Sequence, residues 1–259
     1  MSALPVFEKI RNFRDCGGYV TRTGRSIATR RLFRSAHHTR ATDSDLEGLA
    51  ELDLAAIVDL RMVGERATSP SRRAPNFGGR VVEHERDRTN GLPPHLAAMH
   101  DGTADAETTA VWMAEIYRGI PFDPANTDIF RRFFKCLAAG DGPVLVHCAG
   151  GKDRTGFLVA LTHHMLGVAR EDIAENFLAT NEDVWRDELV CEIMHNALAK
   201  AGKPVSFEAV KKSLLVEMSF LDAAFDAITQ RCGSLDRYLE DEIGVDRQMR
   251  IAVEHCLLI

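Results

Sequence analysis

Short apolar runs and longer amphipathic stretches alternate along the first two thirds of the chain. The runs at 54–60 and 143–146 are short and rich in β-branched residues, which predicts buried parallel strands, and residues 80–84 form a third strand candidate. Apolar residues at helical spacing predict the intervening helices, one starting near Thr42 or Ser44 and two more over 109–119 and 127–137. This order predicts an α/β fold with a central, mostly parallel sheet and helices on both of its faces.

The last third of the chain has an almost wholly helical pattern. Apolar stripes at helical spacing cover about 173–178, 189–198 and 210–228, with a Gly-Lys-Pro break at 202–204. We interpret most of these stripes as core packing. Before them, the polar stretch at 87–108 is the longest loop-like segment, and long loops often carry function.

Length and composition predict one compact domain. The 259 residues, 45% of them hydrophobic, can bury a large core, so we expect a single domain over residues 1–259. The net charge of −6 argues against nucleic acid and anionic membranes as electrostatic partners. An anionic substrate would therefore be recognised by local positive charge inside a pocket.

Cysteine usage and hydropathy indicate a cytoplasmic location. The six cysteines form no CxxC pair, which suits a reducing compartment. The N-terminal residues lack a basic segment followed by a long apolar one, so we expect no ordinary signal peptide. No segment approaches the ~18 apolar residues of a membrane span, so we expect no integral membrane association.

The most informative segment is HCAGGKDRTG at residues 147–156. Its Cys148 and Arg154 lie six positions apart and bracket a glycine-rich loop, here called the signature loop (residues 148–154). A predicted strand leads into this loop, and a helix predicted from Phe157 follows it. A tight loop at a helix N-terminus turns several backbone N–H groups inward, so the signature loop is expected to bind an anion such as phosphate.

The residue types in this segment suit nucleophilic attack on a phosphate. The field of the loop favours the thiolate of Cys148, which is the nucleophilic form, and the planar fork of Arg154 can hold two phosphoryl oxygens. Thr155 can donate a hydrogen bond to the departing sulfur, and His147 is expected to orient the loop rather than act as a base. Gly150 and Gly151 are expected to adopt the left-handed backbone conformation, which lets the loop amides converge. Phosphate binding is assigned to Ala149, Gly150, Gly151, Lys152, Asp153 and Arg154.

The signature loop resembles that of the cysteine-dependent tyrosine and dual-specificity phosphatases, in the bacterial and fungal branch with Lys-Asp before the arginine. Further similar segments cover nearly the whole chain: NFRDCGG at 12–18, LFRS at 32–35, VDLR at 58–61 followed by Glu65 and Arg66, and the helical tail near 220–244. The resemblance implies a tyrosine-phosphatase-like fold and a protein phosphatase that forms a phosphocysteine intermediate. Its substrates would carry phosphotyrosine, and in some relatives also phosphoserine, phosphothreonine or phosphoinositides. No metal or cofactor is expected, because Arg154 and the loop amides neutralise the phosphate.

Two aspartates are candidates for the general acid that gives a proton to the leaving group. Asp153 lies inside the signature loop, and the resemblance favours a signature-loop aspartate as the general acid. Asp87 lies in the long loop upstream of the cysteine, where conventional tyrosine phosphatases carry the acid, and it is the alternative. Other charged residues beside the predicted strands are interpreted as scaffold ion pairs: Arg14, Asp15, Asp59 and Arg61.

The resemblance also bears on substrate choice, access and location. A lysine in the loop, here Lys152, goes with activity on phosphoinositides in this family, so a phosphoinositide-specific lipid phosphatase is an alternative function. Part of the region at about 186–221 corresponds to a helical lid over the active site in a relative. Some relatives are exported without an ordinary signal peptide.

Two further classes of function are compatible with a cysteine in an anion-binding loop. A rhodanese-like sulfurtransferase is one, but such an enzyme would not need Asp153 or the Thr-Gly ending of the segment. A phosphate-binding pseudoenzyme is the other, and it would normally have lost Cys148 or Arg154, which are both present. The phosphatase is therefore the favoured interpretation.

Overall fold

A computed structural model gives the structure of the protein and describes residues 3–83, 85, 105–184 and 206–259. Three predicted segments lie mostly or wholly outside the described residues: the long loop at 87–108, the helix at 189–198 and the break at 202–204. Among the helices that are described, none has both the length and the apolar character needed to cross a membrane.

One sheet organises the described part of the chain. Its strands are β1 (Arg14–Asp15), β2 (Leu32–Ser35), β3 (Ala56–Asp59), β4 (Arg80–Glu83) and β5 (Val144–His147). Their order in the sheet is β1-β2-β5-β3-β4. Only β1 and β2 pair in antiparallel orientation, and the other neighbours are parallel, which confirms the predicted mostly parallel sheet. The central strand is β5, whose Val146 pairs with Arg34 on one side and Val58 on the other.

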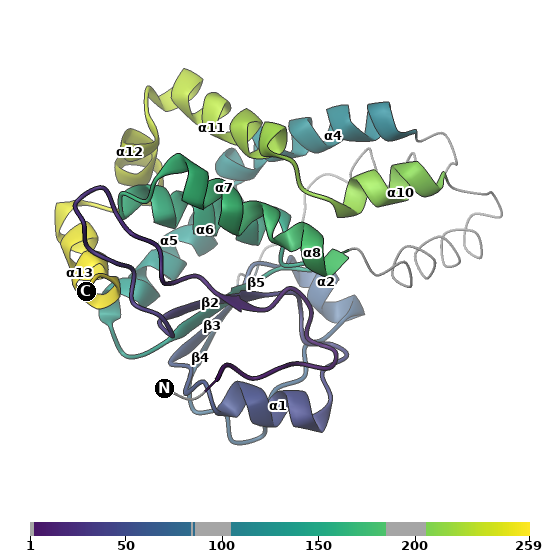
Figure 1. Cartoon of the computed structure of the whole chain (residues 1–259), viewed down its shortest axis with the longest axis vertical. Helices are drawn as coiled ribbons and strands as arrows, with labels where there is room; N and C mark the ends of the chain where they lie inside the picture. Colours follow the sequence, from purple (N-terminus) through teal and green to yellow (C-terminus); the bar gives the residue numbers. More distant parts are fainter. Residues whose placement is uncertain (1–2, 84, 86–104, 185–205) are drawn as a thin grey trace.

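Helices lie on both faces of the sheet, as predicted (Figure 1). Alternate strand residues point to opposite faces. Ile57 and Leu145 pack in a cluster with α1, whereas Val58 and Val146 belong to the larger cluster with α5 and α6. The helices of the first part are α1 (Asp43–Ala50), α2 (Val63–Thr68), α4 (Ala106–Gly119), a short 3-10 helix (Ile120–Phe122), α5 (Pro124–Ala139) and α6 (Asp153–Met165).

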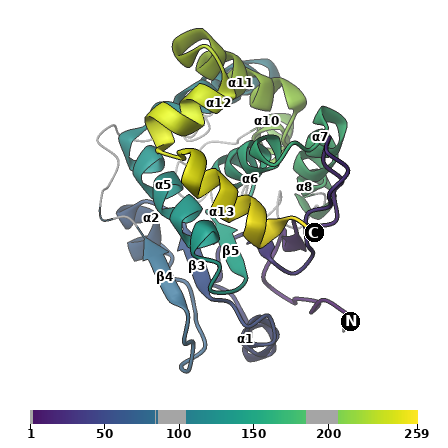
Figure 2. The same cartoon turned by 90° about the vertical axis from the view of Figure 1, so that its left-hand side faces the viewer.

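The rest of the described chain is helical, as the sequence predicts. The helix α4 packs against α10 and α11, and α13 packs across α5 near the C-terminus (Figures 1 and 2). These later helices are α7 (Arg170–Leu178), α8 (Thr180–Val184), α10 (Phe207–Leu214), α11 (Met218–Cys232), α12 (Leu235–Arg237), a π-helix (Tyr238–Ile243) and α13 (Arg247–Leu257).

The predicted start of α1 is confirmed, and its cause is a capping box. Thr42 is the N-cap: its hydroxyl accepts from the Asp45 N–H at 3.1 Å, and its own N–H donates to the Asp45 carboxylate at 3.0 Å. The helix α5 likewise begins behind Asp123, with Pro124 at its first position, and ends at Gly140 in the left-handed region with φ of 67°. Both helices therefore have boundaries encoded by local sequence.

Two predicted helix boundaries are wrong. The helix α6 begins at Asp153 rather than at Phe157, because the end of the signature loop already turns helically and the Gly156 N–H donates to the Lys152 carbonyl at 2.8 Å. The segment predicted at 210–228 is divided into α10 and α11. Between these helices the N–H and carbonyl of Val216 each bond to the side-chain amide of Asn181 at 2.9 Å, which replaces the helical hydrogen bonds.

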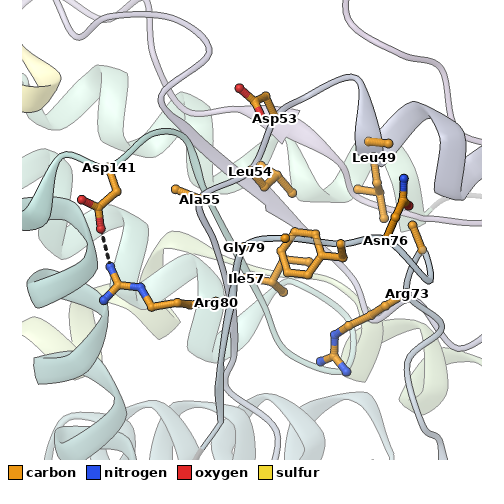
Figure 3. A pocket seen from close by; sticks show the side chains of 14 residues that line it. Leu49, Asp53, Leu54, Ala55, Ile57, Arg73, Asn76, Gly79, Arg80 and Asp141 are labelled. Atoms are coloured by element: carbon orange, nitrogen blue, oxygen red, sulfur yellow. Dashed lines mark hydrogen bonds and ion pairs between the residues drawn. The ribbon is translucent and has the colours of Figure 1, made fainter.

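A cavity of about 670 Å³ lies at the amino ends of β3 and β4 (Figure 3). Leu54, Phe77 and Gly79 are among the residues that line it, and Arg80 bonds to Asp141 at its side at 2.8 Å. The signature loop follows the carboxyl end of β5, so this cavity lies at the opposite edge of the sheet. In parallel α/β sheets the carboxyl edge is where ligands usually bind.

Candidate active site

The signature loop connects the central strand β5 to the first turn of α6. Cys148 directly follows the strand and is only 2% exposed, while Asp153 and Arg154 are the first two residues of the helix. The loop therefore sits at the helix N-terminus, where partial positive charge attracts an anion. This is the strand, loop and helix arrangement that the sequence predicts.

Two glycines of the segment are required by close approaches. Gly151 has φ of 65°, and a Cβ there would lie 2.2 Å from the Ser35 carbonyl oxygen on β2. At Gly156 a Cβ would lie 2.8 Å from the Phe177 ring and 3.2 Å from a guanidinium nitrogen of Arg34. The prediction that both loop glycines are left-handed is wrong for Gly150, whose φ is not positive, because one left-handed residue suffices for this turn.

The rear of the signature loop is held by hydrogen bonds to three successive carbonyl groups. The His37 N–H donates to the Ala149 carbonyl at 3.1 Å. The Asn12 side-chain amide donates to the carbonyls of Gly150 at 3.0 Å and Gly151 at 2.9 Å. With these carbonyls bonded behind the loop, its N–H groups remain available to an anion at the front.

Arg154 lies at the front of the loop in a two-point contact with Glu65. Its two terminal nitrogens donate to the two Glu65 oxygens at 2.7 and 2.6 Å, and one of them also donates to the Leu60 carbonyl at 2.9 Å. Glu65 is itself fixed, because the Met62 N–H donates to it at 2.8 Å. Burial alone would lower the pKa of Arg154, but the Glu65 carboxylate raises it above its ordinary value, so the guanidinium stays charged.

Lys152 and Asp153 form the other charged pair at the front. The Lys152 ammonium donates to the Asp153 carboxylate at 2.9 Å and to the Ser213 carbonyl at the end of α10 at 2.7 Å. The Asp153 side chain is 27% exposed, so solvent and a substrate can reach it. The alternative acid, Asp87, lies outside the described residues.

Tyr117 of α4 is a neighbour of Asp153 that the sequence analysis does not identify. Its side chain is fully buried between the rings of Phe177 and Phe220. Burial first, and then the nearby Asp153 carboxylate, raise the pKa of Tyr117 well above its ordinary value. The phenol therefore stays protonated and faces the acid candidate as a neutral group.

A buried polar network lies beneath Cys148. Asp59 and Arg61 form a fully buried ion pair at 2.7 Å, which confirms the scaffold interpretation of this pair. The His147 Nδ1 atom lies 3.7 Å from the Asp59 carboxylate, and the ring packs at a tilt against the His38 ring with a centroid distance of 4.8 Å. Burial lowers the pKa of His147 to about 4, so the ring is neutral at pH 7 and cannot supply positive charge to the thiolate.

The contacts of His147 and Thr155 bear on their predicted roles. The Nδ1 atom of His147 lies 3.3 Å from the Cys148 carbonyl, a hydrogen bond that supports an orienting role. The hydroxyl of Thr155 is buried and has no hydrogen-bond partner among the described residues, so it makes no contact with the sulfur here. Its donation to the departing sulfur stays a prediction.

Sequence reasoning missed four residues that hold the site: Asn12, Arg34, Glu65 and Tyr117. Three of them lie within the segments that carry the family resemblance, and that position is a signal that could have identified them. Tyr117 lies on a helix with ordinary apolar spacing, and nothing in that pattern distinguishes it from a core residue.

The fold and this site define a phosphatase, and comparison with known proteins agrees. The family described as the tyrosine phosphatase family matches residues 5–259. The chain therefore belongs to the tyrosine phosphatase family, and its activity is that of a protein phosphatase.

Two relatives match over most of their length, and a third matches over a shorter stretch. A Cupriavidus necator protein named as a tyrosine-protein phosphatase is 36% identical over 249 residues, which cover 93% of this chain and 84% of the relative. The triple specificity protein phosphatase PtpB of Mycobacterium tuberculosis is 31% identical over 261 residues, which cover 89% of this chain and 90% of the relative. A tyrosine-protein phosphatase of Nostoc commune is 30% identical over a shorter stretch of 146 residues.

Proposed function

We propose that the protein hydrolyses phosphotyrosine in proteins through a phosphocysteine on Cys148. The Cys148 thiolate attacks phosphorus, the bond to the ester oxygen breaks, and Asp153 gives that oxygen a proton. A water molecule then attacks the phosphocysteine, Asp153 takes a proton from this water, and the thiolate leaves. Arg154 binds two equatorial oxygens in both steps and needs no metal to do so.

One observation supports the proposal: Cys148 and Arg154 bracket a loop whose carbonyl groups are bonded at its rear, so that its N–H groups can face an anion. The carbonyls of Ala149, Gly150 and Gly151 are all bonded at the rear of the loop. This arrangement presents the opposite, N–H edge of the loop beside Cys148 and Arg154. A dianion bound there meets a nucleophile on one side and a fixed cation on the other.

Asp153 is the general acid in this proposal. It lies on the same first helical turn as Arg154, and its carboxylate is partly exposed beside Lys152. The adjacent Tyr117 phenol is neutral, so it does not repel the carboxylate that forms when the proton has left. Asp87 remains the alternative acid, and the leaving-group experiment in the Discussion separates the two.

Phosphotyrosine is the proposed main substrate because the chain belongs to the tyrosine phosphatase family. Activity on phosphoinositides is opposed by the contacts that Lys152 makes in this structure. The relative PtpB is named a triple specificity protein phosphatase. A second phosphate, as in a phosphoinositide, would need the Lys152 ammonium, which here bonds to Asp153 and to the Ser213 carbonyl. Activity on phosphoinositides therefore requires that Lys152 exchange these partners for the ligand, and Lys152→Ala should reduce it more than activity on phosphotyrosine.

The helices α10 and α11 are proposed to act as part of a lid. Residues 206–221 of the predicted lid region are described, and Ser213 in α10 contacts the signature loop through Lys152. Asn181 of α8 holds the link between α10 and α11 through Val216. Opening the site at this point would break the Lys152 contact, while the Asn181 contact can serve as the fixed end.

We also propose that the protein works in a reducing compartment such as the cytoplasm. Cys148 must remain a thiol to attack phosphorus. The other cysteines of the described chain, Cys16, Cys136, Cys232 and Cys256, are unpaired as well. A reducing compartment keeps all of these thiols in that state.

The test is a panel of phosphotyrosyl, phosphoseryl and phosphothreonyl peptides and phosphoinositides, with free phosphate as the readout. The native protein should release phosphate fastest from phosphotyrosine, with a chelator present. Cys148→Ser should still bind the peptide but abolish release, because the serine hydroxyl is not ionised in this field. Substantial phosphate release by the serine variant would contradict the assignment of the nucleophile.

A further inference from the structure

Arg34 is a fully buried cation beneath the signature loop, with no ion-pair partner in the described part of the chain. It is 0% exposed and lies on β2, where it pairs with Val146, two residues before Cys148. Its acceptors are the Gly151 carbonyl at 2.7 Å, the Asn176 side-chain oxygen at 3.2 Å and the Thr180 hydroxyl at 3.4 Å. All three acceptors are neutral, and the Arg34 Nε has no hydrogen-bond partner among the described residues.

The guanidinium charge of Arg34 is costly to bury without an ion-pair partner. A buried arginine is normally paired with a carboxylate, because desolvating a guanidinium costs several kcal/mol that neutral acceptors only partly offset. The neighbouring chain is built around it: Gly156 leaves the room that a side chain would take from its guanidinium. The charge stays in place because arginine does not deprotonate in proteins.

The anions that could offset this charge are those of the reaction. Cys148 lies close enough to Arg34 for the two groups to influence each other: burial lowers the pKa of Arg34, and the two nearby cysteines, Cys16 and Cys148, raise it. Burial also raises the pKa of Cys16 to about 11, so that neighbour stays a neutral thiol at pH 7. This leaves the Cys148 thiolate and the bound phosphate as the negative charges that Arg34 can stabilise.

We propose that Arg34 is a positioning residue of the reaction, which fixes the rear of the signature loop through Gly151 and places a permanent positive charge behind Cys148. It does not touch the substrate. It acts together with Asn12, just before β1, whose amide donates to the same Gly151 carbonyl at 2.9 Å. Asn12 adopts φ of 55°, which asparagine tolerates and which aims this amide at the loop.

Arg34 therefore complements Arg154. Arg154 meets the phosphate from the front and is neutralised by Glu65 before substrate binds, whereas Arg34 acts from the rear and is not neutralised. Its effect is on the thiolate and the loop conformation rather than on contacts to substrate. This inference rests on the proposed thiolate chemistry.

The test separates the charge of Arg34 from its hydrogen bond. Arg34→Gln keeps one donor for the Gly151 carbonyl but removes the charge, while Arg34→Lys keeps the charge but loses the planar fork. The first readout is the pH dependence of Cys148 alkylation by iodoacetamide, scored by mass on the peptide that contains Cys148. The charged and titratable groups around the sulfur and Arg34 are Arg14, Cys16, Tyr19, Glu65, Tyr117, His147, Asp153, Arg154 and His163.

The expected results follow from the sign of the charge. In Arg34→Gln the midpoint of alkylation should move up by about one pH unit or more, because the thiolate has lost a nearby cation. The kcat for a phosphotyrosyl peptide should fall about tenfold or more with a smaller change in KM. In Arg34→Lys the alkylation midpoint should stay near that of the native protein while kcat still falls.

Arg131→Gln is the matched control, because Arg131 on α5 also donates to two carbonyls, those of Glu242 and Ile243, in part-buried hydrogen bonds that do not involve the signature loop. It should change stability without moving the alkylation midpoint. If Arg34→Gln does not fold, the kcat of Arg34→Lys tests the inference, because the inference predicts that this kcat falls. A native alkylation profile and kcat within twofold in folded Arg34 variants would overturn the inference. If the native protein released no phosphate at all, the proposed function would fail instead.

Discussion

The front and the rear of the signature loop are built from different kinds of contact. At the front, Lys152, Asp153 and Arg154 have partly exposed side chains, at 11%, 27% and 17%, and they meet groups of opposite charge. At the rear, Asn12 and Arg34 are 4% and 0% exposed and meet only neutral acceptors. The front of the loop is thus partly exposed to solvent and its charges are paired. The rear is buried and is held by hydrogen bonds donated to loop carbonyls.

The difference shows how one short loop can combine a contact that a substrate can replace at its front with fixed contacts at its rear. The partly exposed ion pair of Lys152 and Asp153 contributes about 1 kcal/mol or less, so an arriving phosphate can replace it at little cost, whereas the two-point contact of Glu65 holds Arg154 in place. A buried hydrogen bond to a carbonyl is costly to lose, because the carbonyl would be left unsatisfied at about 1–3 kcal/mol. The Lys152 contact at the front can therefore change during each turnover, while the rear contacts set the geometry of the amides when the chain folds.

The largest expected effect is at the front, in Arg154→Lys. A lysine keeps the charge but cannot bind two phosphoryl oxygens or both oxygens of Glu65 at once. We expect kcat for a phosphotyrosyl peptide to fall by about 10²- to 10³-fold, measured by phosphate release. A near-normal kcat would mean that the front of the loop does not bind the transferring phosphate.

The next effect depends on the leaving group and concerns Asp153→Asn. An activated aryl phosphate barely needs a proton donor, whereas an ester of a weakly acidic alcohol does. The variant should slow the poor substrate by about 10²-fold, spare the activated one comparatively, and flatten the basic limb of the pH profile. Asp87→Asn is the matched variant. If the leaving-group dependence appears there and not at Asp153, the acid is in the upstream loop.

A smaller effect is expected for Glu65→Gln, which keeps the shape of the side chain but removes its charge. One amide oxygen can still accept from Arg154, but the two-point contact is lost, so the guanidinium is held less firmly. We expect kcat to fall about tenfold while KM changes less, from steady-state kinetics on the phosphotyrosyl peptide. A raised KM with an unchanged kcat would show that Glu65 serves binding rather than orientation.

Two buried histidines should make the protein less stable at acidic pH: His147, which directly precedes Cys148, and His163 of α6, whose ring bonds to the Cys16 carbonyl at 2.8 Å. Burial lowers the pKa of His147 and of His163 to about 4, from an ordinary value of 6.5. Below 6.5 the unfolded chain takes up protons that the folded protein refuses, so the free energy of unfolding falls as the pH decreases toward 4. Between pH 7 and 5 each histidine should cost about 2 kcal/mol in urea unfolding.

Asp59 extends this loss of stability to more acidic pH. Burial alone would raise its pKa, but His147 and Arg61 lower it to about 2, so its contribution is present above its ordinary value of 3.8 and is lost as the pH falls toward 2. His163→Gln should remove part of the slope between pH 7 and 5, and His255→Gln, at an exposed position, is the control. A slope that is the same in both variants would contradict the role of the buried ring.

The sequence predicted the sheet and the strand, loop and helix that form the signature loop, for physical reasons that are local. The β-branched run before Cys148 and the capping residue Thr42 each specify an element through short-range preferences, and the spacing of Cys148 and Arg154 defines the loop. The predicted start of α6 at Phe157 was wrong because the glycines and polar residues of the loop show no helical pattern before that residue.

The rear of the site could not be predicted in the same way. Asn12 and Gly151 are 139 positions apart, and Arg34 reaches the same carbonyl over 117 positions, so no local pattern connects them. The buried guanidinium is also contrary to the rule that arginine is exposed or paired with an acid. Only the register of β2 beside β5 brings Arg34 behind the loop, and that register depends on the whole sheet.

The measurement that tests the central claim most directly is the identification of the phosphorylated residue during turnover. Native protein mixed with a phosphotyrosyl peptide would be quenched in acid within milliseconds, digested and examined by mass spectrometry, with Cys148→Ser in parallel. We predict one phosphoryl group on the Cys148 peptide of the native protein and none on that peptide of the variant. Turnover without any phosphorylated Cys148 peptide, or a phosphoryl group on another residue, would contradict the account.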